Sequence, residues 1–231
     1  MSYFNRYQRG EFQPVWNELV DAGVAVWNKP LFNDARDVAL ATMERVRKNL
    51  ERLQSRLEGI GYEFMHPEPV ALANRNAVDK LTAFENAYGR LAISASVWYQ
   101  TFQCVDFEQS TDQYEGVSGP NELHGLGLEP AMTVRSIQHG IKTWNERRRL
   151  GKTVQQNILL VGPTLSNCDT AHFELDAHHM DDLNFADDGC DDARFVEHIR
   201  FAINRCGGLD WRDLPEHNRL IQYLSDDLEP F

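Results

Sequence analysis

The feature that most constrains the fold is a long stretch of helical periodicity between residues 34 and 59. Apolar residues recur there at alternating spacings of four and three, the pattern of one face of an α-helix. Charged residues such as Arg45, Lys48 and Glu51 fill the positions between them. The stretch predicts an amphipathic helix about 39 Å long with a narrow apolar seam. The seam consists of Ala39, Met43, Val46, Leu50, Leu53, Leu57 and Ile60.

Two kinds of partner would bury such a seam. One is the rest of the same chain, including a first helix predicted at residues 14–27. The other is a second copy, which would make a homodimer through the 34–59 helix. Because three heptads is short for a coiled coil, packing within the chain is favoured over the dimer.

The last third of the chain changes from helical to strand periodicity. The stretch NILLVGP (157–163) predicts a buried strand, and AHFELD (171–176) alternates as a half-exposed strand does. We expect these two strands to pair antiparallel. A helix follows, with Phe195, Ile199, Ala202 and Cys206 facing inward, and it ends at the glycine pair 207–208. Between these parts we expect a strand within 61–69, a helix at 76–88, a strand at 105–107 and a helix at 133–148.

This order of elements predicts an α+β fold. N-terminal amphipathic helices come first, followed by a mostly antiparallel or mixed sheet that helices cover on one face. We divide the chain into an N-terminal helical region, 1–89, packed on an α+β core, 90–231, the two forming one structural unit.

Several features indicate the cellular setting. No apolar run approaches the roughly 20 residues that cross a bilayer, and the N-terminus lacks the apolar stretch of a secretory signal. The four cysteines include no CxxC pair, so free thiols are favoured over a zinc framework or a disulfide scaffold. We therefore expect a cytoplasmic protein.

The acidity of the chain is concentrated in one segment. The formal net charge is −12, and residues 164–192 contain nine acids without a single lysine or arginine. Such a patch repels nucleic acid and attracts cationic partners. The nine acids are Asp169, Glu174, Asp176, Asp181, Asp182, Asp187, Asp188, Asp191 and Asp192.

This segment predicts a surface for a basic protein partner, with neither nucleic acid nor membrane involved. Carboxylates would supply the charge, and a histidine pair would offer aromatic or hydrogen-bond contacts. The predicted contact residues are Asp176, His178, His179, Asp181, Asp182, Asp187 and Asp188.

A metal-dependent enzyme is the alternative for the same segment. Strand positions 172, 174 and 176 point to one side, and histidine, glutamate and aspartate all bind divalent ions. The spacing matches no established signature such as HExxH, so a solvated acidic face is favoured and no cofactor is expected. The candidate ligands are His172, Glu174, Asp176, His178 and Asp181.

Signatures of other chemistries are missing. No GxSxG elbow is present, and GKT at 151–153 lacks the upstream glycine of a phosphate-binding loop. Cys168 has carboxylate neighbours, which disfavour its thiolate. The basic run at 147–149 suits the C-terminal end of a helix.

Three stretches carry a resemblance to a known family. SASVWYQTFQCVDF (94–107), FVEHIRFAINRCGGL (195–209) and MERVRKNLERLQSRLEGIGYEF (43–64) resemble the helix-to-strand segment, the terminal helix and the long N-terminal helix of the SUKH superfamily, the Smi/Knr-like immunity fold. The chain departs from that pattern at LAIS (91–94), where Leu-Pro is usual, and at Gln103 or Cys104, where glycine is expected.

The resemblance implies a non-enzymatic binding module. Proteins of this kind commonly neutralise a toxin domain, often a nuclease, in bacterial polymorphic toxin systems. Nucleases need cationic surfaces to hold phosphates, so the acidic segment agrees with this expectation through a separate argument.

Overall fold

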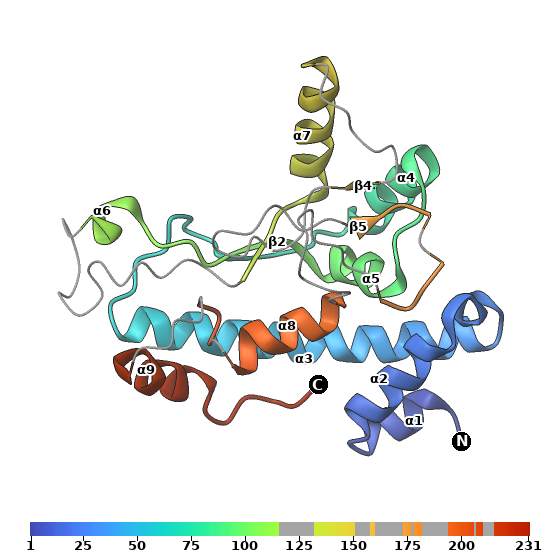
Figure 1. Ribbon diagram of the computed structural model, residues 1–231, viewed down its shortest axis with the longest axis horizontal. Coiled ribbons are helices and arrows are strands. Elements are labelled where there is room, and N and C mark those ends of the chain that lie inside the picture. The colour runs from blue at the N-terminus through green and yellow to red at the C-terminus, as the bar shows by residue number, and fades with distance from the viewer. Residues whose placement is uncertain are drawn as a thin grey trace.

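The computed structural model of the chain describes residues 1–115, 132–150, 158–159, 173–176, 178–181, 194–205, 207–209 and 215–231. Within these ranges the chain has the predicted α+β fold, with the N-terminal helices first (Figure 1). The helices are α1 (Tyr3–Gln8), α2 (Phe12–Asp21), the 3₁₀ helix η1 (Gly23–Trp27), α3 (Leu31–Gly59), α4 (Ala77–Tyr88), α5 (Ile93–Thr101), α6 (Thr111–Tyr114), α7 (Ile137–Arg149), α8 (Phe195–Asn204) and α9 (Pro215–Ser225). The strands are β1 (Val70–Leu72), β2 (Phe102–Asp106), β3 (Thr133–Val134), β4 (Ile158–Leu159) and β5 (Phe173–Glu174).

Helix α3 is the axis of the molecule. It has 29 residues and runs along one side of the sheet for much of the length of the protein (Figure 1). Its predicted seam is buried within the chain, because residues from Ala39 to Leu57 on that face have no exposed surface and α3 packs against α1, η1, α5 and α9. Packing of this seam within the chain is therefore confirmed, and the homodimer through the 34–59 helix stays a prediction. Among the described residues, no helix has both the length and the apolar character needed to cross a membrane.

The predicted first helix is divided in two. Helix α2 ends at Asp21, and η1 continues to Trp27 after Gly23, which has a φ of 53°. The positive φ suits glycine and breaks the α-helical path, so η1 leaves the direction of α2. This turn places Trp27 near the start of α3.

The main sheet is small and antiparallel. Strand β2 lies between β1 and β3, with Val105 opposite both Val70 and Val134. The strand predicted within 61–69 is wrong, since only an isolated bridge joins Phe64 to Gln109 there. Prolines at 67 and 69 donate no backbone hydrogen bond, and the strand begins directly after them.

A second sheet of two strands lies apart from the first. Strands β4 and β5 pair antiparallel, as predicted, with Ile158 opposite Glu174.

Helix α8 packs its predicted inner face into the core. Phe195, Ile199 and Ala202 are fully buried, and Cys206 lies outside the described residues. The glycine pair ends the helix as expected. Gly208 has a φ of 83°, and a Cβ at this position would lie 2.8 Å from Cδ2 of Phe107, so no other residue fits without displacing the neighbouring ring.

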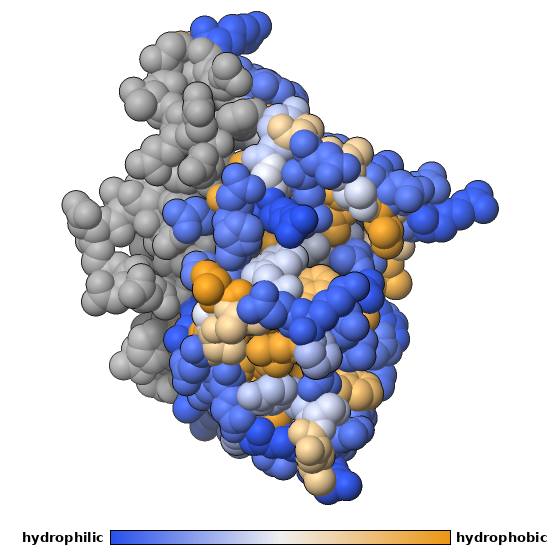
Figure 2. Space-filling view, turned by 90° about the vertical axis from the view of Figure 1, so that its right-hand side faces the viewer, coloured by the Kyte–Doolittle hydropathy of each residue, from blue (hydrophilic) through white to orange (hydrophobic). Residues whose placement is uncertain are grey.

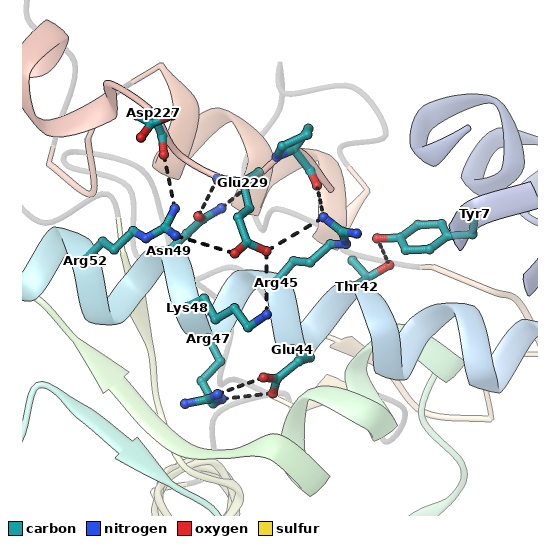
Figure 3. Close-up of polar contacts among 11 residues, drawn as sticks. Tyr7, Thr42, Glu44, Arg45, Arg47, Lys48, Asn49, Arg52, Asp227 and Glu229 are labelled. Atoms are coloured by element: carbon teal, nitrogen blue, oxygen red, sulfur yellow. Dashed lines mark hydrogen bonds and ion pairs between the residues drawn. The ribbon is translucent and has the colours of Figure 1, made fainter. Parts of the chain in front are cut away.

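The segment after α9 lies on the basic face of α3 (Figure 3). The Asn49 side-chain amide donates to the carbonyl of Glu229 and accepts from its N–H, both at 2.8 Å. Arg45 and Arg52 donate to backbone carbonyls of the same segment, at Pro230 and Asp227. Much of the charge of α3 is thus used within the chain.

Candidate functional site

The described part of the acidic segment begins with the predicted alternation. Phe173 and Leu175 are buried, and Glu174 and Asp176 are exposed. The strand stops there, since Asp176 has a φ of 60°, a left-handed conformation that aspartate tolerates. Glu174 therefore stands on β5 and Asp176 in the turn that follows it, while the alternate side chains Phe173 and Leu175 are anchored in the core.

Three of the predicted contact residues lie on the surface. Asp176, His178 and His179 are exposed. The ring of His178 meets the edge of Trp27, with centroids 6.2 Å apart, and Asp176 accepts a hydrogen bond from the backbone N–H of Arg90 at 3.3 Å. Three more of the predicted contact residues, Asp182, Asp187 and Asp188, lie outside the described residues.

Asp181 does not lie on this surface, which corrects the prediction. Only 6% of it is exposed. Its carboxylate accepts hydrogen bonds from Ser94 Oγ at 2.6 Å, Trp16 Nε1 at 3.2 Å and the N–H of Val196 at 3.1 Å. Burial raises the pKa of the Asp181 carboxyl to about 6, and these three hydrogen bonds oppose the rise.

The burial of Asp181 follows from the ends of two helices. Val196 belongs to the first turn of α8, and the N–H groups of Ile93 and Ser94 at the start of α5 donate to the carbonyls of His179 and Met180. The residues flanking these helices on the N-terminal side, Ala92 and Arg194, provide no side-chain cap. Segment 179–181 supplies the missing acceptors, and a carboxylate suits a helix N-terminus. Two helices without cap residues were the signal in the sequence that an acceptor had to come from elsewhere.

The described residues do not assemble the alternative metal site. No three of Glu174, Asp176, His178 and Asp181 lie close enough together to share an ion. The first three residues are exposed, with Asp176 bonded to Arg90 and His178 packed against Trp27, and Asp181 is buried. His172 lies outside the described residues.

A different set of three side chains, which no pattern in the sequence brings together, lies close enough to bind a metal ion. His66, Asp106 and Glu108 are the one set of three such side chains, among the described residues, whose ligand atoms lie within 4.8 Å of one another. Asp106 and Glu108 are alternate residues at the end of β2, a visible signal, but His66 is far from them in sequence.

A guanidinium already occupies this group. Arg135 forms a short ion pair with Asp106 and lies 3.4 Å from Glu108, while His66 Nε2 lies 3.4 Å from Asp106. Thr133 Oγ1 and the N–H of Glu108 donate to the other oxygen of Asp106. A metal ion would have to displace Arg135, so the arrangement is better explained as an ion pair that ties β2 to the chain after β3.

A cleft opens beside segment 176–179. It lies between η1, the start of α3, α4 and α5, and has a volume of about 480 Å³. Figure 2 looks onto the end of the molecule where these elements lie, and shows small hydrophobic patches among hydrophilic side chains. The lining residues used below are Trp27, Lys29, Phe32, Arg36, Glu85 and Arg90.

The wall of the cleft combines aromatic rings with positive charge. Trp27 and Phe32 stack with centroids 5.1 Å apart, and the guanidinium of Arg90 lies 5.5 Å from the Trp27 centroid. Glu85 is the one acidic residue of the lining, and burial raises the pKa of its carboxyl. Its Oε1 accepts the N–H of Leu91 at 3.3 Å, so it is used in the connection between α4 and α5.

No family model, curated protein or solved structure matches the chain. The likeness to the SUKH superfamily thus rests on the three quoted stretches alone.

Proposed function

We propose that the protein is a non-enzymatic binding module that contacts a basic protein partner through the acidic segment at 169–192. Nine acids without a counter-cation in residues 164–192 are the observation that carries the proposal. The described part of the segment supports it, because Glu174 on β5 and Asp176 in the following turn hold exposed carboxylates, and Phe173 and Leu175 beside them are buried. A fixed row of charge of this kind speeds the approach of a cationic partner.

The partner would be a cationic toxin domain such as a nuclease, as the SUKH-like stretches imply. A nuclease binds phosphates with lysine and arginine side chains. An acidic segment that covers these side chains would prevent substrate binding by charge and by bulk. Occlusion of this kind needs no catalytic residue on the binding module.

The burial of Asp181 shortens the set of residues that we propose for the contact. Asp181 belongs to the core and is removed from the set. Asp176, His178 and His179 remain as exposed members. Asp182, Asp187 and Asp188 remain as predicted members outside the described residues.

The test begins with the partner and then measures how fast it binds. The product of a neighbouring reading frame, or a protein recovered by pull-down from the native cell, is purified and mixed with the wild type in a stopped-flow instrument at 20 to 300 mM salt. We expect the triple variant D182K/D187K/D188K to associate about tenfold more slowly at low salt, with a flatter salt dependence.

A matched control separates local charge from net charge. The variant D21K/D37K/E68K makes the same change in net charge at exposed positions outside the segment. It should associate nearly as fast as the wild type. Equal rates for all three proteins would remove segment 169–192 from the interface and overturn the proposal.

A further inference from the structure

The cleft between η1, α3, α4 and α5 has the dimensions of a small-molecule site. Its volume of about 480 Å³ falls within the range of ligand pockets, roughly 300 to 1,000 Å³. It is lined by residues of η1, α3, α4 and α5, together with Lys29 and Arg90 in the connections between these helices, rather than by the described residues of the acidic segment. The two surfaces are neighbours through the contact of His178 with Trp27.

Among the described residues of the lining, positive charge exceeds negative charge, although Glu85 interacts with Arg90. Lys29, Arg36 and Arg90 line the cleft, and none of them forms an ion pair within the part of the chain that the structure describes. Arg36 donates from Nη2 to Gln100 at 3.1 Å and keeps its other donors. In a chain of net charge −12, three cationic side chains in the lining of one cavity, against one acidic side chain, are a local reversal of sign.

The apolar wall defines the rest of the ligand. Trp27 and Phe32 form one aromatic surface, and Ile93 and Val97 from α5 add aliphatic surface. Arginine recognises carboxylate and phosphate through paired donors, and aromatic walls hold flat or apolar groups. The combination suits a molecule with an apolar body and one anionic end.

Acidic groups close to the cleft do not reverse this preference. Glu85 is partly buried and held by the N–H of Leu91 and by Ser96. Asp176 accepts from the backbone of Arg90 at the rim. The lining contains three cationic side chains and one acidic side chain, Glu85, so it carries an excess of positive charge.

We propose that this cleft binds a small organic anion, an aromatic or apolar body that carries a carboxylate or phosphate group. The anionic group lies among Arg36, Arg90 and Lys29, and the body lies against Trp27 and Phe32. The proposal is independent of the basic protein partner, since the two surfaces have opposite charge and different residues.

The indole N–H of Trp27 gives a local reporter. It is enclosed and has no hydrogen-bond acceptor among the residues that the structure describes, so its resonance responds to rearrangement at the cleft rather than to solvent. Uniformly ¹⁵N-labelled protein is titrated with phenyl phosphate, phenylacetate and, as the neutral analogue, benzyl alcohol. The variant W27F assigns the Trp27 signal among the five tryptophans.

We expect saturable shifts of the Trp27 signal with at least one anionic probe, and binding at least tenfold weaker for benzyl alcohol. The two anions distinguish a carboxylate site from a phosphate site. The double variant R36Q/R90Q should bind the preferred anion at least tenfold more weakly than the wild type. The control R75Q/R205Q removes the same charge at exposed positions outside the cleft and should bind as the wild type does.

Three outcomes would overturn the proposal. One is a Trp27 signal that does not move with either anion up to 10 mM. Another is equal binding of benzyl alcohol and the anions, which would describe an apolar cleft. The last is unchanged affinity in R36Q/R90Q when its other backbone signals match those of the wild type and show that it is folded.

Discussion

Two polar networks in this molecule differ mainly in their exposure. The first joins Glu229 to α3, where its carboxylate lies 3.7 Å from Arg45, 3.8 Å from Lys48 and 3.5 Å from Arg52 (Figure 3). These side chains are between 25% and 44% exposed. Water and salt screen such pairs, which contribute about 0 to 1 kcal/mol each.

The second network surrounds Asp181. It connects α2, α5 and α8 through Trp16, Ser94 and Val196, all of which donate to one buried carboxylate. Arg200 lies close enough to interact with the same charge, and burial lowers the pKa of its guanidinium. Removing the Asp181 carboxylate would leave these three donors buried with neither an acceptor nor water. This would lower the free energy of unfolding far more than the loss of an exposed ion pair.

The number of charges in a network is therefore a poor guide to how much that network stabilises the fold. The Glu229 network has more ion pairs, but the uncharged amide of Asn49 makes the better-defined contact with that segment. The Asp181 network has one acid, yet it closes two helix ends. Three predictions test this difference, from the largest effect to the smallest.

The largest effect is expected for D181A. It leaves the hydroxyl of Ser94, the indole N–H of Trp16 and the N–H of Val196 without an acceptor in the core. We expect the free energy of unfolding in urea at pH 7 to fall by about 3 to 5 kcal/mol.

The matched variant for this test is D181N. An asparagine can accept from Trp16 and Val196 through its oxygen and donate to Ser94 through its amide nitrogen. It should lose less than half of the stability that D181A loses. A loss below 1 kcal/mol in D181A would show that the network does not support the fold.

A smaller effect is expected from pH. The pKa of Asp181 is about 6 in the folded chain, against an ordinary value of 3.8. The folded state therefore holds this proton more tightly, so stability from this group is full below pH 4 and is lost as pH rises through 6. This difference in pKa between the folded and unfolded chain corresponds to a change of roughly 2 to 3 kcal/mol in the free energy of unfolding.

The measurement is the free energy of unfolding of the wild type minus that of D181N, between pH 4 and 7. The subtraction removes the titration of the other carboxyl groups. The difference should decrease toward higher pH and level off above pH 6.5. A difference that stays flat or increases would mean that Asp181 is ionised without cost in the folded protein.

The smallest effect is expected at the contact between α3 and the segment after α9, where N49A, at a buried position, should cost about 1 to 2 kcal/mol. The alanine removes both hydrogen bonds to the backbone of Glu229.

The matched variant is E229Q, which should lower the free energy of unfolding less than N49A does, and its effect should vanish at 0.5 M salt. Hydrogen exchange at the Glu229 N–H should be faster in N49A alone. A larger cost for E229Q would mean that charge, rather than the amide, holds the segment.

Much of the fold was predictable because the patterns that specify it are local. The seam of α3, the alternation from Phe173 to Asp176 and the glycine pair after α8 are each visible within a few turns or residues. The strand predicted within 61–69 was wrong, because Pro67 and Pro69 cannot donate the backbone hydrogen bonds of a strand. The division of the first helix at Gly23 was equally local and was missed.

The candidate sites were less predictable because their parts are far apart in the chain. Asp181 meets Trp16 and Ser94, which are 165 and 87 positions away. Asp181 and Asp182 look alike in the sequence, and nothing near them tells which one a helix end will need. The same holds for Arg135, which reaches Asp106 across 29 positions.

Local patterns specify the helical axis, the α+β class and the strongly acidic segment, because periodicity and charge are properties of neighbouring residues. Folding of distant segments onto one another is what makes Asp181 a buried acceptor, covers the α3 seam with its own chain and places three cationic side chains in the lining of one cleft. Each of these depends on segments that fold together from distant parts of the chain, and the energy of a buried or converging charge is set by what surrounds it in space.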